Sequence, residues 1–407
     1  MKDVMDGHAG SDCCADGHHG PALKLEDALA RILAEVAPVS GTETIPLPEA
    51  LGRILAADVV SQIDVPAHTN SAMDGYALRG DDLLSDADTR LDVIGVAAAG
   101  RPFDGVVAAG KCVRILTGAP LPEGADTVVM QEHCEGTETS VRVLKLPALG
   151  ANIRRRGQDI GSGQCVLGAG QRLRPQDLGL AASLGCASLP VYRRLRVAIL
   201  STGDELVEPG QQAGPGQIYN SNRFTMMGQL SAWGFEVVDI GVARDRPAAV
   251  REHITQAAQQ ADVVITSGGV SVGEEDHVKS VVEALGSLEL WRIAIKPGKP
   301  FIGLPGNPVS VFVTLLVVAR PFLFACQGIA QRELHPVSAL AGFSKPGSTR
   351  EDYLRVRNAG HGLELFPNPS SGVLTSTCWA DGLVRQKVGE DITVGGRVDY
   401  LPFGLFD

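Results

Sequence analysis

A short apolar run that ends in two glycines constrains the fold of this chain more than any other feature. Residues 261–266 read Ala-Asp-Val-Val-Ile-Thr, and Ser267, Gly268 and Gly269 follow directly. A β-rich run bounded by glycines is typical of a buried parallel strand that delivers a loop at its carboxyl end. Glycines in such a loop allow positive φ and let backbone N–H groups approach a ligand closely. Taken alone, the loop could equally be a tight turn without a ligand.

Strands and helices alternate around this run. The apolar patterns predict strands over 196–200 and 236–240 and helices over 220–230, 250–259 and 278–285. Strand, helix, strand, helix and strand at this spacing predict a βαβ domain with a parallel sheet. Three polar strand ends then converge at one edge, carrying Glu205, Asp245 and the loop 267–276. Ligands of open α/β sheets bind at this edge.

The chemistry of the neighbouring residues suits a phosphate-bearing ligand. Glu274, Glu275 and Asp276 follow the glycine loop, and Lys296 and Lys299 follow the next apolar run. Acids, backbone donors and lysines close together suit phosphates bound with a divalent cation. The loop matches neither the P-loop nor the G-x-G-x-x-G pattern, so these residues leave the identity of the ligand open.

Composition limits the classes of partner. The 407 residues allow two to four domains, and the formal net charge is −11, from 47 acidic against 36 basic residues. This balance argues against general binding to nucleic acid or to anionic membranes, which needs clustered positive charge. The eight cysteines include no C-x-x-C pair, so we expect free thiols rather than a disulfide framework.

We expect a soluble cytoplasmic protein. The first 20 residues are polar and lack the apolar segment of a signal peptide. The most apolar helix candidate, 309–319, is too short to span a bilayer and is interrupted by Arg320-Pro321. We therefore read the apolar residues 311–326 as a broken helix or helix pair, buried or at an interface.

The first 20 residues also gather histidine, cysteine and aspartate. They include His8, Cys13, Cys14, His18 and His19. A metal-scavenging tail is one interpretation, and a disordered leader is the other. The leader is favoured because no spacing matches a closed zinc site. Helices are predicted next, over 25–36 and 47–55.

A β-rich region follows. Asp74 directly precedes a glycine, which indicates either a turn or an acid held at a domain edge. Short strands and turns are predicted over 91–143. Arg154-Arg155-Arg156 then precedes Asp159, either as a solvated linker or as an anion contact with Asp159 near a cation. Short alternating segments over 339–406 predict a small all-β domain.

Seven segments together resemble the MoeA family of molybdopterin molybdenumtransferases, which is related to the E domain of gephyrin. In chain order they are SAMDGYA (71–77), LTGAP (116–120), RRGQD (155–159), STGDEL (201–206), TSGGVSVG (266–273), KPGKP (296–300) and GLPGNPVS (303–310). The resemblance covers residues 22–407. The stretch 193–328 alone also fits the related molybdopterin adenylyltransferases.

The resemblance implies a multidomain α/β and β fold. Its parts are a central βαβ parallel-sheet domain of the molybdopterin-binding type, a β-rich second domain, a small mixed α/β linking domain and a C-terminal all-β, barrel-like domain. These correspond to 193–328, 61–159, 22–60 with 160–192, and 329–407, after a disordered leader over 1–21.

The resemblance also implies an activity and partners. The family inserts molybdenum from molybdate into adenylylated molybdopterin with Mg²⁺, releasing AMP and the molybdenum cofactor. Its members are elongated homodimers, with a cleft between the α/β domain of one subunit and the β-rich domain of the other. Expected partners are the molybdopterin adenylyltransferase and downstream molybdenum-cofactor proteins, without nucleic acid or membrane. Two alternatives remain: an adenylyltransferase that uses ATP one step earlier, and a scaffold, a role that gephyrin also serves.

Site residues follow from the same resemblance. The positions that match catalytic residues are Asp74, Thr117, Asp159, Glu205, Asp245 and Asp276, of which Glu205, Asp245 and Asp276 would hold the metal. The positions that match ligand-binding residues are Ser267, Gly268, Gly269, Ser271, Gly273, Lys296, Lys299, Pro305, Pro308, Arg350 and Ser376. Asp74 and Thr117 would act from the partner subunit.

Two departures from the family pattern stand out. Residues 299–302 run straight into Gly303, whereas some relatives carry a longer hairpin there, so the cleft wall would be shorter. Cys378 and Trp379 replace a more usual small residue and arginine, which bears on the assignment of molybdate contacts to Arg350 and Ser376.

Overall fold

The computed structural model describes residues 25–34, 36, 38–39, 41–83, 89–269, 277–289, 292–295, 299–330 and 334–406. The leader and the candidate site residues Ser271, Gly273, Asp276 and Lys296 lie outside the described residues. The chain divides into two compact units. The first comprises Met1–Pro38, Leu195–Cys326 and Arg332–Asp407, and the second comprises Val39–Arg194 and Gln327–Gln331.

The first unit contains a six-stranded sheet in the order β16-β13-β17-β20-β19-β18. The first four strands are parallel, which confirms the predicted βαβ domain, and the last two are antiparallel. Their bounds are β13 Arg196–Thr202, β16 Glu236–Ala243, β17 Val263–Ser267, β18 Gly286–Glu289, β19 Arg292–Ile295 and β20 Lys299–Leu304.

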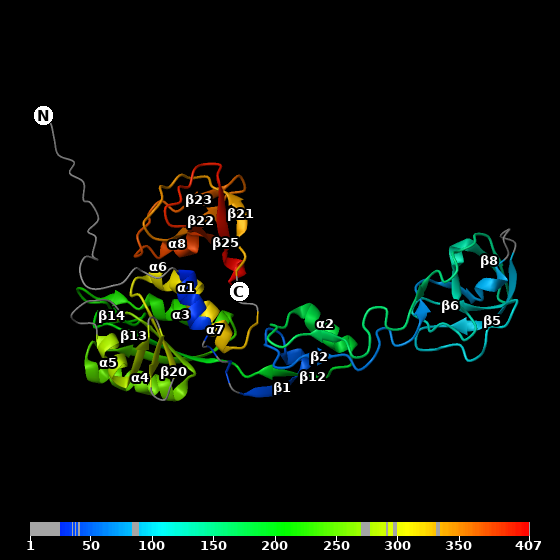
Figure 1. The fold of residues 1–407 in the computed structure, drawn as a ribbon, viewed down its shortest axis with the longest axis horizontal. Coiled ribbons are helices and arrows are strands. Elements are labelled where there is room, and N and C mark those ends of the chain that lie inside the picture. The colour runs from blue at the N-terminus through cyan, green and yellow to red at the C-terminus, as the bar shows by residue number, and fades with distance from the viewer. Residues whose placement is uncertain are drawn as a thin grey trace. The chain divides into compact units, whose positions relative to one another are not determined.

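Helices cover both faces of this sheet. Ala198, Leu200 and Val264 point to a core shared with α4 and α5, while Ile199 and Ile265, between them in sequence, are also buried. Strands buried on both faces read as continuous apolar runs, which is why the pattern identified them. The helices are α3 Ser221–Ala232, α4 Pro247–Gln260 and α5 His277–Leu285 (Figure 1).

The apolar segment after β20 is one continuous helix. It runs from Pro308 to Cys326 as α6 Pro308–Thr314, a π-helical segment Leu315–Ala319 and α7 Arg320–Cys326. The predicted break at Arg320-Pro321 is therefore wrong. Pro321 has no N–H to donate to the preceding turn. The helix accommodates this missing hydrogen bond with π-helical geometry just before Pro321. By length and composition the helix could cross a membrane, but 61% of its most apolar window is buried inside the protein, as in a soluble core helix.

A small antiparallel sheet completes the first unit, as the alternating pattern predicted. Its order is β21-β25-β24-β22-β23, with bounds β21 Val337–Leu340, β22 Asp352–Asn358, β23 Leu363–Leu365, β24 Gly382–Gln386 and β25 Arg397–Pro402. Helix α8, Thr375–Trp379, precedes β24. The end of the chain packs on the α/β domain, where Trp233 Nε1 and Arg320 Nε donate to Phe406 O at 2.6 and 3.0 Å. Helix α1, Leu25–Ala34, contacts α7.

The second unit contains a β-rich sheet in the order β7-β4-β6-β5-β9-β8. Tyr76 and Leu78 of β4 face one core, and Ala77 between them faces another, so the sheet is packed on both sides. The bounds are β4 Gly75–Leu78, β5 Arg90–Ala97, β6 Lys111–Ile115, β7 Thr127–Met130, β8 Cys134–Gly136 and β9 Ser140–Val143.

The remainder of this unit pairs distant segments. β1 Thr42–Pro46 pairs with β12 Ser188–Tyr192, β2 Val59–Val60 with β11 Cys165–Leu167, and β3 Asn70–Ser71 with β10 Ile153–Arg154, while α2 spans Pro175–Ser183. The helix predicted over 47–55 is wrong. Only Leu47–Glu49 forms a 3-10 turn. Gly52 has a φ of 73°, which is outside helical geometry, and Leu55 is buried and pairs with Val191 as in a strand.

The six described cysteines are free thiols, as predicted. The five-part domain division stays a prediction.

Candidate functional site

Three strand ends of the first unit meet at one edge of the parallel sheet. Ser201 of β13 and Leu304 of β20 both pair with Ser267, the last residue of β17. The segments that follow, 203–205, 268–269 and 305–308, therefore leave the sheet at the same carboxyl edge. This is the edge at which the strand pattern predicted a ligand site.

The glycine pair packs directly against β13. Gly268 donates its N–H to Leu304 O at 3.2 Å and has a φ of 84°, and Gly269 has a φ of 67°. A Cβ on Gly268 would lie 2.8 Å from Thr202 O, and one on Gly269 would lie 2.6 Å from Thr202 Oγ1. The glycines are thus required by the protein's own backbone, as well as by any ligand that approaches the loop.

Buried polar atoms without partners gather near this edge. Within the described part of the chain, Thr202 Oγ1, Thr266 Oγ1 and Asn220 Nδ2 have no hydrogen-bond partner, although each residue is at most 4% exposed. A buried polar group left unpaired costs roughly 1–3 kcal/mol. A polar ligand that reaches this edge would recover some of that free energy.

The proline-containing loop 305–308 is held at both ends. Asn222 Nδ2 donates to Gly306 O at 2.7 Å, and Val309 N donates to Ser371 O at 3.1 Å. Pro308 is the first residue of α6, a position where its missing N–H costs nothing. The sequence places Asn222 only within the predicted helix 220–230, because no local pattern links it to residue 306.

The acidic loops after β13 and β16 interlock, as predicted. Asp204 N donates to Asp245 Oδ2 at 3.2 Å, and Asp245 N donates to Asp204 Oδ1 at 3.4 Å. Glu205, the next residue, is exposed and folds back over Gly203, whose φ is 149°. Among the residues that the structure describes, no group of three or more His, Cys, Asp or Glu side chains could hold a metal ion. Asp276, the third predicted ligand, is outside that set.

Lys299 lies at the other end of the sheet. It is the first residue of β20 and Leu304 is the last, so about five steps of 3.3 Å, roughly 17 Å, separate them. Its Nζ lies 3.7 Å from Asp262 Oδ1, just before β17. The structure therefore does not bring Lys299 to the edge that carries Gly268 and Gly269.

In the second unit, two predicted site residues 43 positions apart form a close pair. Asp74 Oδ1 accepts from both the backbone N and the Oγ1 of Thr117, each at 2.7 Å. These hydrogen bonds, the backbone one first, lower the pKa of Asp74. Arg114, which the sequence did not single out, adds positive charge beside it, donates to Gly75 O at 2.9 Å and lies over the Tyr76 ring.

The arginine triplet contributes one structural ion pair. Arg156 Nε donates to Asp64 Oδ2 at 2.6 Å, and Ser162 N donates to Asp64 Oδ1 at 2.9 Å. The Ser162 bond is the larger cause that lowers the pKa of Asp64, followed by Arg156. Asp159 is exposed, and its backbone N–H donates to Val65 O. The contact between Arg156 and Asp64 is thus one within the chain.

The structure does not bring together Ser376 of α8 and Arg350, the two residues that the resemblance assigned to molybdate. Ser376 is fully buried and accepts from Arg355 Nε at 3.1 Å, whereas the Arg350 side chain is 87% exposed, with its Nε 3.9 Å from Asp352 Oδ1. Burial lowers the pKa of Arg355. Trp379 packs edge-on against Phe366.

Comparisons with known proteins agree with this architecture. The family model for the MoeA N-terminal region, domains I and II, matches residues 23–185, and the probable molybdopterin binding domain matches residues 198–325. The chain is 44% identical to the molybdopterin molybdenumtransferase of Haemophilus influenzae, covering 94% of this chain and 98% of that protein. It is 38% identical to molybdopterin molybdenumtransferase 2 of Mycobacterium tuberculosis, covering 89% and 94%.

A solved structure extends the similarity to the fold. The molybdopterin biosynthesis MoeA protein of Pyrococcus horikoshii is 28% identical and superposes with a TM-score of 0.82, over 93% of this chain and 99% of that chain. The two family models and the full-length relatives agree on one assignment, and the chain belongs to the MoeA family.

Proposed function

We infer that this protein is a molybdopterin molybdenumtransferase, a transferase of molybdenum cofactor biosynthesis. The observation that carries this conclusion is end-to-end similarity to proteins of that name. An adenylyltransferase would account only for the α/β region, whereas here the MoeA N-terminal region matches as well. The substrates are molybdate and adenylylated molybdopterin.

The carboxyl edge of the parallel sheet is the proposed substrate site. The hydroxyls of Thr202 and Thr266 and the amide of Asn220 supply hydrogen bonds to a polar ligand, and the loop 305–308 borders the same edge. In cleavage, oxygen from water or molybdate bonds to phosphorus, the phosphoanhydride P–O bond breaks, and AMP leaves with the bridging oxygen.

Glu205 and Asp245 fit a Mg²⁺ ion that the substrate helps to bind. Mg²⁺ is usually held by one or two carboxylates together with substrate phosphates, and these two acids lie on the loops that Asp204 and Asp245 join at the proposed substrate edge. When bound, Mg²⁺ neutralises charge on the phosphoanhydride and stabilises the leaving phosphate. The two loops set where the phosphates lie.

Asp74 and Thr117 form the second part of the proposed site, contributed by the partner subunit of a homodimer. The Thr117 hydrogen bonds fix the Asp74 carboxylate in direction, which suits orienting water or a substrate N–H or O–H group. The protein works in the cytoplasm, where its free thiols stay reduced, and receives its substrate from an adenylyltransferase.

AMP release tests this function. The purified protein is incubated with adenylylated molybdopterin and Mg²⁺, with and without molybdate. Molybdate-dependent AMP release supports the proposal, and we expect Asp276→Asn to lose it while keeping the fold. ATP-dependent adenylylation of free molybdopterin would move the function one step earlier. Neither activity in a folded protein would favour the scaffold alternative.

A further inference from the structure

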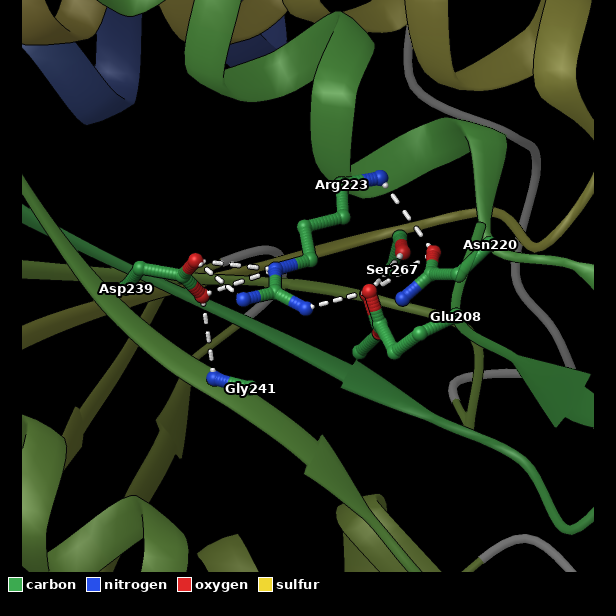
Figure 2. Close-up of polar contacts among 7 residues, drawn as sticks. Glu208, Asn220, Arg223, Asp239, Gly241 and Ser267 are labelled. Atoms are coloured by element: carbon green, nitrogen blue, oxygen red, sulfur yellow. Dashed lines mark hydrogen bonds and ion pairs between the residues drawn. The ribbon is translucent and has the colours of Figure 1, made fainter. Parts of the chain in front are cut away.

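An arginine at the start of α3 connects two segments that lead to the acidic loops. Arg223 Nε donates to Asp239 Oδ1 at 3.0 Å and to Oδ2 at 2.8 Å, and its Nη1 lies 2.6 Å from Glu208 Oε2 (Figure 2). Its side chain is 22% exposed, against 25% for Asp239 and 32% for Glu208. The Asp239 hydrogen bonds raise the pKa of Arg223 further above its already high value, so the arginine stays charged.

One acid of this network anchors the loop that carries Glu205. Glu208 follows Glu205 by three residues, across β14 Leu206–Val207. β14 pairs in parallel with β15 Ile218–Tyr219, and Glu205 O accepts from Ile218 N at 2.9 Å. The contact between Glu208 and Arg223 therefore fixes the far end of a short segment whose near end is Glu205.

The other acid supports an irregularity in the strand that leads to Asp245. Ile199 and Leu200 of β13 pair with Asp239 and Gly241, so residue 240 is skipped in the register. Asp239 Oδ1 also accepts from Gly241 N at 3.0 Å (Figure 2). A bulge of this kind bends a strand and changes the direction of its end, and this strand ends two residues before Asp245.

We propose that Arg223 is the positioning residue that sets the two acidic loops relative to each other, acting through Glu208 and Asp239. This inference rests on the proposed function, in which Glu205 and Asp245 hold the Mg²⁺ of the substrate. A planar guanidinium that bonds one carboxylate through two N–H···O contacts and a second through another nitrogen fixes both distance and angle. A partly buried ion pair is weak evidence for stability, but its geometry is specific.

The test compares Arg223 of α3 with Arg196, which lies at the amino ends of β13 and β16, away from the acidic loops. Arg223→Lys keeps the positive charge but loses the planar guanidinium that contacts both carboxylates, and Arg223→Met loses both the charge and the guanidinium. Arg196→Met is the matched control, because Arg196 Nε donates to Glu236 Oε1 at 3.0 Å across β13 and β16 at their amino ends. The readouts are kcat for AMP release, the Mg²⁺ concentration for half-maximal rate, and amide hydrogen exchange of 203–208 and 239–245.

We expect both Arg223 variants to lose about 10-fold to 100-fold in kcat or in apparent Mg²⁺ affinity, as is typical when a residue that orients a ligand is removed. The KM for adenylylated molybdopterin should change little, and hydrogen exchange should accelerate in both segments. Arg196→Met should leave all of these readouts as in the wild type. An Arg223→Lys enzyme with wild-type kcat, Mg²⁺ dependence and exchange would overturn the proposal.

A triple variant separates positioning from folding. Glu208→Gln, Arg223→Met and Asp239→Asn together remove the unpaired charges that Arg223→Met alone would leave. Thermal stability near the wild type with turnover still low supports positioning, whereas restored turnover contradicts it. Faster hydrogen exchange in the Arg223 variants supports the positioning role of Arg223, whether or not the enzyme is active. A wild-type protein without molybdate-dependent AMP release would instead refute the proposed function.

Discussion

The two ends of the parallel sheet share their strands but differ in how their polar groups are paired. At the amino end, Arg196 bonds Glu236 across β13 and β16, and Lys299 lies beside Asp262. At the carboxyl end, Thr202 and Thr266 bury hydroxyls that have no partner in the described part of the chain. One end is thus satisfied by the protein itself, while the other retains hydrogen-bonding capacity that a substrate can use.

The largest expected effect comes from an acid at the carboxyl end. We expect Asp245→Asn to lower molybdate-dependent AMP release by about 100-fold or more, because the amide can still accept from Asp204 N but has no charge to hold Mg²⁺. The melting temperature should stay close to that of the wild type. Asp262→Asn at the amino end is the control. Equal losses of turnover in the two variants would contradict the view that only the carboxyl end of the sheet binds substrate.

A backbone change at the carboxyl end should affect stability. In Gly269→Ala the new Cβ would lie 2.4 Å from Val278 Cγ2 at a φ of 67°, so we expect a loss of about 3 kcal/mol in unfolding free energy. Gly234→Ala has a similar φ of 85° with open space around its Cβ, and should lose only about 1 kcal/mol. Urea titrations measure both values. A similar loss in both variants would show that the close packing of Gly269 on Val278 and Thr202 is unimportant.

In the β-rich domain, the carboxylate of Asp74 accepts hydrogen bonds from Thr117 of the same chain. The pKa of Asp74 is lowered when folded, so its stabilising contribution is present above the unfolded pKa and is lost as pH falls through the folded value. Thr117→Val removes the side-chain bond and should raise the Asp74 pKa and move acid unfolding to higher pH. Carboxyl NMR titration measures the first effect. Thr137→Val, in an exposed turn of the same domain, is the control and should change neither.

The smallest effect is expected at Lys299. Its contact with Asp262 is 3.7 Å long and one-third exposed on the lysine side, so Lys299→Ala should cost less than about 1 kcal/mol. AMP release should stay near the wild-type rate, although the matching family position is a cleft lysine. A large loss of turnover with unchanged stability would show that Lys299 reaches the substrate.

The strands and their convergence could be predicted because fully buried parallel strands leave a strong local signal. Pairings that depend on register could not. Asp74 and Thr117 came from a resemblance and not from spacing, and Arg114 was missed because the pairing of β4 with β6 is invisible in sequence. Asn222 and Arg223 each contact a residue at least 15 positions away. The place of Lys299 could not be predicted, because the family motifs do not show that Lys299 and Leu304 are the two ends of one strand.

The discontinuity of the first unit has a consequence for biosynthesis. Helix α1 near the start and Phe406 near the end of the chain both pack against α7. During translation, residues 39–194 are available as a nearly complete compact unit before any of the strands described in the first unit has been made. Helix α1 therefore has no α7 to pack against until more than 280 further residues have been synthesised.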